Sequence, residues 1–172
     1  DEGSVPIRLD RYCIDGQIFR RGNAKDAPAA ILIDISGSMS LSAEEIESVC
    51  EAAAGKAIVA TYCGYNGGGE LKIVAKGLRR APNDQLGPRW GGNAIDGPAL
   101  KWLAKQKGRR VWWSDGIVTG KNDITKEAIR AASRWAMGNG IIRLAYASQV
   151  ISYLRNPDSV QPCGVPEVAR LG

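Results

Sequence analysis

Four short apolar runs, separated by amphipathic segments, restrict the fold of this chain more than any other feature. The runs lie within residues 28–36, 56–64, 109–116 and 141–147 and are rich in Ala, Ile, Val, Leu and Trp. Apolar runs of this length are typical of strands that are buried on both faces of a parallel sheet. The segments between them have the length and periodicity of crossover helices. The sequence therefore predicts an α/β fold with a doubly wound, mostly parallel sheet and helices on both faces.

Four helices are predicted between and after these strands, over residues 41–54, 95–105, 121–137 and 148–154. The first has the clearest start, because Ser42 is followed three residues later by Glu45, the pattern of a capping box. Its apolar positions share one face. In the helix over 121–137 the residues expected to face inward are Ile124, Ala128, Ala131, Ala132 and Trp135.

The segments outside this pattern define the domain organisation. Residues 70–77 alternate after a glycine-rich turn, which predicts an antiparallel edge strand, and residues 78–88 are predicted to form a polar loop. Residues 1–28 are expected to form an N-terminal β-hairpin extension with its turn at Asp15-Gly16, because apolar and polar residues alternate from about Ile7 to Arg20. The α/β domain is expected over 29–155, followed by a C-terminal tail over 156–172.

Composition removes several classes of function. The chain of 172 residues has no histidine, which excludes Ser-His and Cys-His nucleophile pairs, and its four cysteines are widely spread, which argues against a zinc site. Cys50 and Cys63 stand among small apolar residues and are expected to be buried. No apolar stretch is long enough to cross a membrane and no leader is visible, so we expect a cytoplasmic protein without a membrane partner.

Two predicted strands end in an acid, Asp34 and Asp115, and Asp34 begins the pattern Asp-x-Ser-x-Ser with Ser36 and Ser38. The carboxyl ends of parallel strands meet at one edge of the sheet, where ligands of α/β proteins bind. Two carboxylates at that edge repel each other unless a cation lies between them. Because carboxylate and hydroxyl oxygens suit hard cations, the pattern predicts a site for Mg²⁺, or for Mn²⁺ or Ca²⁺.

The motif DISGSMS after a buried strand, GGN before a helix and SDG after a later strand together resemble the metal-ion-dependent adhesion site (MIDAS) of the von Willebrand factor A (vWA) family. The resemblance covers about residues 29–146. It implies that Ser36 and Ser38 are direct ligands and that Asp34 and Asp115 bind the metal directly or through water. The family has a threonine after two glycines, where this chain has Asn93. The amide oxygen of Asn93, or the carboxylate of Asp96, is expected to replace it.

The same resemblance implies a function. It predicts a metal-dependent module that binds a protein or peptide, with a carboxylate of the partner completing the metal shell, and it predicts no catalytic residues. Trp90 is expected at the rim of the site, where it can touch a ligand, and the hydroxyl of Thr119 is expected in the outer shell of the metal.

Three alternatives remain open from the sequence. In the first, no metal binds: Asp34 accepts backbone N–H groups in its turn, and the two serines cap the following helix. In the second, the strand-end carboxylates and Mg²⁺ serve a phosphoryl-transfer or hydrolytic enzyme. In the third, the chain is an RNA- or ribonucleoprotein-associated vWA protein, because its net charge is +5. That alternative requires the pairs Arg79-Arg80 and Arg109-Arg110 to cluster on the surface.

Overall fold

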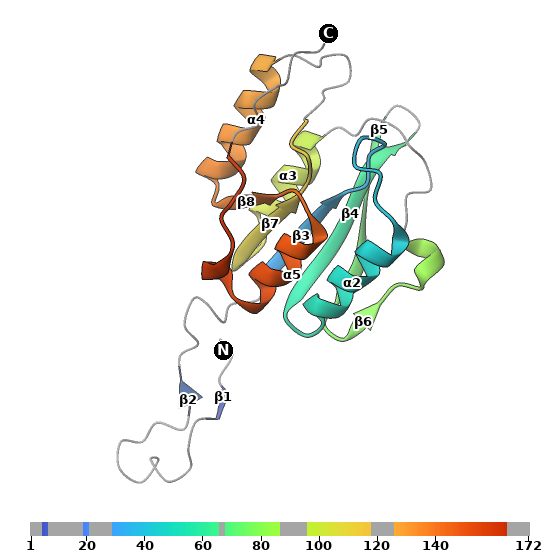
Figure 1. Cartoon of the computed structure of the whole chain (residues 1–172), viewed down its shortest axis with the longest axis vertical. Coiled ribbons are helices and arrows are strands. Elements are labelled where there is room, and N and C mark those ends of the chain that lie inside the picture. Colours follow the sequence, from blue (N-terminus) through green and yellow to red (C-terminus); the bar gives the residue numbers. More distant parts are fainter. Residues whose placement is uncertain are drawn as a thin grey trace.

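The computed structural model describes residues 5–6, 19–20, 29–65, 68–86, 96–117 and 126–164. Within this part of the chain a six-stranded mixed sheet lies between two pairs of helices, so the predicted α/β class is confirmed (Figure 1). A separate pair of two-residue strands, β1 (Val5–Pro6) and β2 (Phe19–Arg20), is antiparallel. The predicted turn at Asp15-Gly16 lies outside the described residues.

Four consecutive strands of the sheet are parallel, as the apolar runs predict. They are β3 (Ala29–Asp34), β4 (Ala57–Tyr65), β7 (Arg109–Trp113) and β8 (Ile141–Leu144). The antiparallel strands β5 (Gly68–Lys76) and β6 (Arg79–Arg80) extend the sheet beyond β4. The strand order is β6-β5-β4-β3-β7-β8. The strand order reverses beside β3, so its carboxyl end lies where ligands of such sheets bind.

The sheet is covered on both faces. Helices α2 (Ala43–Ala53) and α5 (Ala147–Arg155) pack against one face, and α3 (Asp96–Ala104) and α4 (Lys126–Gly138) against the other. The side chains of β3 alternate between these two layers, with Ile31 and Ile33 in the first and Ala30 and Leu32 in the second. Trp112 and Trp113 point to opposite faces and are both buried. No helix among the described residues is long and apolar enough to cross a membrane.

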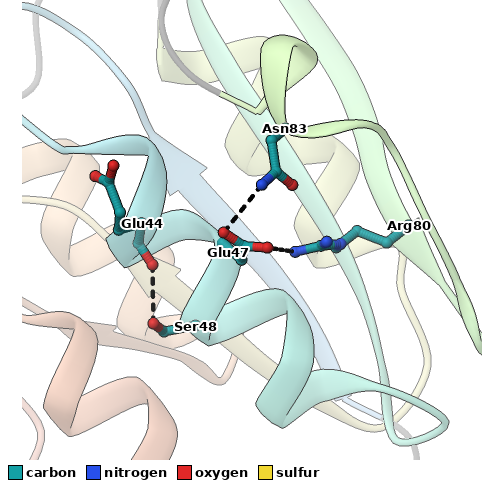
Figure 2. Close-up of polar contacts among 5 residues, drawn as sticks. All are labelled: Glu44, Glu47, Ser48, Arg80 and Asn83. Carbon is teal, nitrogen blue, oxygen red and sulfur yellow. Dashed lines mark hydrogen bonds and ion pairs between the residues drawn. The ribbon is translucent and has the colours of Figure 1, made fainter.

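Helix α2 begins as the sequence predicts. The backbone N–H of Glu45 donates to the Ser42 hydroxyl (3.2 Å), and the Ser42 N–H donates to the Glu45 carboxylate (3.0 Å), which completes the capping box. On its exposed side the helix is tied to the sheet edge by Glu47, whose carboxylate accepts from Arg80 on β6 and from Asn83 (Figure 2). Asn83 begins the short helix η2 (Asn83–Gln85). These contacts fix the helix that follows the Asp34 turn.

Two expectations about the periphery were wrong. Residues 78–88 contain β6 and η2 instead of only a loop: Gly77, at φ +61°, allows a tight turn that pairs Arg79 with Lys76. On α4, Trp135 is 40% exposed, and Ala131 is exposed as well, whereas Ala132 packs partly buried against the core as predicted. The residues that face the sheet there are small, with Ser133 and Ala136 buried, which lets the helix approach closely. Ile124 and the side chain of Ala128 lie outside the described part of the chain.

The last part of the described chain runs beside the outermost parallel strand. After α5 comes a short helix, η3 (Pro157–Ser159), and the N–H of Cys163 then donates to the Arg143 carbonyl on β8 (3.0 Å). The Arg143 guanidinium in turn donates to the carbonyl of Gly164 (2.7 Å). Cys163 carries a free thiol, as do the buried Cys50 and Cys63. The burial predicted for Cys50 and Cys63 is confirmed.

Candidate metal-binding site

Asp34 is the last residue of β3, and its carboxylate is held inside the protein. The side chain is 2% exposed, and each oxygen has a donor: the Ser36 N–H for Oδ1 (2.9 Å) and the Ser114 hydroxyl for Oδ2 (2.8 Å). The pKa of Asp34 is raised, with burial as the largest cause, and the hydrogen bonds from Ser36 and Ser114 offset only part of this effect. A carboxylate in this environment is stabilised by further positive charge, which a cation supplies.

Ser36 and Ser38 lie in the turn that leaves Asp34, and their hydroxyl oxygens are 3.2 Å apart. Two neighbouring ligands of an octahedral Mg²⁺ ion, each at about 2.1 Å, are separated by about 3 Å. The distance between the two hydroxyl oxygens is therefore close to that between adjacent ligands of one ion. The turn ends at Ser40, whose φ of +47° is uncommon for a residue other than glycine. Neither serine caps α2, because Ser42 does so.

Asp115 lies at the same edge, in the loop that follows β7. Its negative charge contributes to the raised pKa of Asp34, so the two carboxylates are within electrostatic range. Its backbone N–H contacts the sulfur of Met39 in the Asp34 turn (3.0 Å), and its Oδ1 accepts from the Ile117 N–H (2.8 Å). Arg143 donates to the Asp115 carbonyl (2.9 Å). The Asp34 turn and the Asp115 loop thus form one connected unit.

Asp96, the predicted substitute for the family's threonine, is buried at the start of α3. Its Oδ1 accepts from the Tyr62 hydroxyl at 2.6 Å, and that hydroxyl accepts from the Trp112 indole N–H at 3.0 Å. Tyr62 pairs with Asp34 across β4 and β3. Burial raises the pKa of Tyr62, and the charges of Asp34 and Asp96 raise it further. Asp96 therefore lies on the same side of the sheet as Asp34, and the Tyr62 hydroxyl connects α3 to the sheet.

The structure brings together Asp34, Ser36, Ser38 and Asp115, with Asp96 nearby. Trp90, Asn93 and Thr119, which the sequence also singles out, lie outside the described residues. Ser114 and Arg143 support the site and were missed by the sequence analysis. A signal for each was present, since Ser114 immediately precedes Asp115 and Arg143 is a charged residue within an apolar strand.

The basic pairs do not form one patch. Arg79 and Arg80 lie on β6 and Arg109 and Arg110 on β7, four strands apart, which corresponds to about 19 Å at the usual strand spacing. Arg80 pairs with Glu47, and Arg110 donates to the carbonyls of Gln106 and Asn139. The Arg109 guanidinium lies over the Tyr153 ring, 5.6 Å from its centre. This arrangement lacks the clustering that nucleic-acid binding requires of these residues.

The residues present fit a hard cation better than a soft one. In the described part of the chain, no three Cys, Asp or Glu side chains gather closely enough to hold a metal ion, and the sequence has no histidine. Any ion at the Asp34 turn is therefore bound by few carboxylates together with hydroxyls. Mg²⁺ tolerates such a set because it retains several waters as ligands.

Comparison of the chain with protein-family models, with curated proteins and with solved structures finds no match. The candidate site therefore rests on the geometry described above and on the sequence motifs.

Proposed function

We propose that this chain is a vWA-like, MIDAS-containing module that holds one divalent cation at the carboxyl edge of its sheet and uses it to bind a protein or peptide. Asp34, Ser36, Ser38 and Asp115 are its ligands, directly or through water, and a carboxylate of the partner completes the shell. Mg²⁺ is the expected ion, with Mn²⁺ or Ca²⁺ as substitutes, and the cytoplasm is the expected location.

The observation that carries the proposal is the convergence at the end of β3. A buried carboxylate is followed by two hydroxyl oxygens 3.2 Å apart, and a second carboxylate lies within electrostatic range at the same edge of the sheet. The metal-free alternative makes two predictions. The first holds, because Asp34 accepts a hydrogen bond from the Ser36 N–H. The second does not, because Ser42, and neither Ser36 nor Ser38, caps α2. The Ser36 and Ser38 hydroxyls instead form a hydrogen bond with each other (3.2 Å), which bound metal would replace.

The small number of side-chain oxygens also favours a role in binding a partner over a role in transport or storage of the ion. An octahedral cation held by two hydroxyls and one or two carboxylates keeps two or three positions for water. A carboxylate of a partner replaces such a water at little cost, because it brings the opposite charge and the oxygen chemistry that the ion prefers. Metal-mediated recognition of an acidic group follows from this open shell.

The first test is calorimetric titration of the chain with Mg²⁺ and with Mn²⁺. We expect saturable binding of one ion, lost in Ser36→Ala/Ser38→Ala. Ser48→Ala is the matched control: its hydroxyl donates to the Glu44 carbonyl on the exposed side of α2, away from the site (Figure 2). Equal binding by wild type and the double variant would refute the assigned ligands, and no binding by wild type would refute the function.

The second test concerns the open positions. Protein-bound Mn²⁺ with exchangeable water ligands enhances the relaxation of water protons. We expect a short acidic peptide to reduce this enhancement by displacing water, and the same peptide with Asn and Gln in place of its acids to have no effect. Hydrolysis of a generic phosphate ester that requires both Mg²⁺ and Asp34 would favour the enzyme alternative instead.

A further inference from the structure

A cavity of about 250 Å³ opens between α3 and the strands β4 and β5, and neither the ligands proposed above nor the core accounts for it. Its walls are mainly apolar. They are formed by two groups of residues, Tyr62, Glu70 and Leu71 from the sheet and Pro98, Ala99 and Trp102 from α3. Leu71 and Trp102 are partly buried, so the cavity presents apolar surface to an incoming group.

The register of the sheet places this cavity beside the candidate metal site. Asp34 pairs with Tyr62, and Tyr62 pairs with Leu71, so the two cavity residues lie one and two strands from Asp34. At the usual strand spacing these separations are about 5 and 10 Å. Asp34 also follows Ala30 and Leu32 on the face that α3 covers, the face to which Tyr62 belongs. The carboxylate and the cavity are therefore neighbours on one face.

The chemistry of the walls selects an apolar occupant. The Tyr62 hydroxyl is already bonded to Asp96 and to the Trp112 indole, so it offers little to a polar ligand. Glu70 at the wall disfavours a second anionic group inside the cavity. In size, an apolar cavity of about 150 Å³ is enough for a benzene ring, whereas pockets for drug-sized ligands begin at about 300 Å³. One large side chain matches the space.

We propose that the cavity receives an aromatic or large aliphatic side chain of the same acidic segment whose carboxylate binds at the metal. This inference rests on the proposed function. In an extended peptide, side chains two residues apart lie about 7 Å from each other on the same side. That distance lies between the separations of about 5 and 10 Å that the register gives from Asp34 to the wall residues Tyr62 and Leu71. The module thus recognises an acid and an apolar residue two positions apart.

The test uses short blocked peptides and calorimetry with Mg²⁺ present. The probes are acetyl-Asp-Gly-Phe-amide and its reversed order, each compared with versions in which Ala replaces Phe or Asn replaces Asp. Of the two Phe peptides, the one with the higher affinity should bind about 10- to 100-fold more tightly than its Ala counterpart, because the ring is buried in the cavity. The Asn versions and the samples in EDTA should not bind.

Variants locate the preference. Leu71→Trp fills the cavity and Trp102→Ala removes a wall, and each should abolish the difference between the Phe and Ala peptides. Ile73→Trp is the control, because Ile73 lies on the same strand but is 49% exposed and is not part of the cavity wall. Thermal unfolding of each variant establishes that it is folded. The two cavity variants change different elements, β5 for Leu71 and α3 for Trp102, so a local disturbance of one element does not explain an effect common to both.

The outcomes separate the two proposals. If each Phe peptide and its Ala counterpart bind with equal, metal-dependent affinity, the cavity has no role in recognition. The metal-dependent function would then remain intact. Persistence of the Phe preference in both cavity variants would overturn this location for the side chain. Absence of metal binding by the wild-type chain would overturn the proposed function, and the assignment of the cavity with it.

Discussion

The hydroxyl of Tyr62 joins three elements near the candidate site, and its removal is the sharpest test of the structure. In Tyr62→Phe the ring remains, so the packing and the cavity wall are kept. The Trp112 indole N–H, on a side chain that is 1% exposed, loses its acceptor, and Asp96 Oδ1 loses a donor at 2.6 Å. The raised pKa of Tyr62 keeps the phenol protonated, so the donor is present throughout the neutral range.

The magnitude follows from these two losses. A buried donor left without a partner costs about 1–3 kcal/mol, and a hydrogen bond to a charged group contributes about 1.5–3 kcal/mol. We therefore expect Tyr62→Phe to reduce the free energy of unfolding by about 2.5–6 kcal/mol. In a domain of this size each kcal/mol corresponds to about 2–4 °C, so the melting temperature should fall by about 5–24 °C.

The assay is thermal or urea unfolding followed by circular dichroism. Tyr153→Phe is the matched control: Tyr153 is buried as well, but its hydroxyl makes no hydrogen bond within the described part of the chain, and Phe keeps the ring under Arg109. The control should change the free energy of unfolding by less than about 1 kcal/mol. If both variants unfold together with wild type, the Tyr62 hydroxyl does not hold α3 to the sheet, and the arrangement described for Asp96 is wrong.

Three further predictions concern single side chains. Ser42→Ala should lower the free energy of unfolding by about 1 kcal/mol in urea unfolding, because it removes the cap of α2, and Ser42→Gly should cost less. Arg80 lowers the pKa of Glu47 in the folded state, so the pair stabilises the fold at any pH above the pKa of Glu47 in the unfolded chain. This stabilisation is lost as the pH falls through the pKa of Glu47 in the folded state. The urea midpoint of Glu47→Gln should therefore approach that of wild type in acid. Asp34→Asn removes a buried charge whose ionised form burial disfavours; in EDTA it should melt at or above the wild-type temperature, and it should lose the stabilisation that Mg²⁺ gives wild type. A variant that Mg²⁺ still stabilises fully would remove Asp34 from the ligand set.

The parts of the fold that follow from local chemistry could be predicted from the sequence. The capping box depends on two residues three positions apart, and the Asp34 turn on five consecutive residues, so both are visible as short patterns. The parallel strands are visible because burial on both faces requires continuous apolar runs. The convergence of Asp34 and Asp115 at one edge then follows from the parallel direction of their strands.

The contacts between distant segments could not be predicted in the same way. Ser114 reaches Asp34 across 80 residues of sequence, and only the register of β3 and β7 brings them together. On α4 the large Trp135 suggested the wrong inward face, because the helix lies against the sheet through small residues such as Ala136. Helical periodicity identifies an amphipathic segment, but it does not identify which face a close-packed neighbour accepts.

The segment beside β8 has a consequence for the behaviour of the isolated protein. Strand β8 is the last of the sheet, and an uncovered outer strand offers its N–H and C=O groups to any other chain. The Cys163 N–H occupies the Arg143 carbonyl on that border, and the Arg143 guanidinium holds the segment there through the Gly164 carbonyl. A protein shortened after residue 155 loses this cover, and it should self-associate through β8 at concentrations where the full chain stays monodisperse.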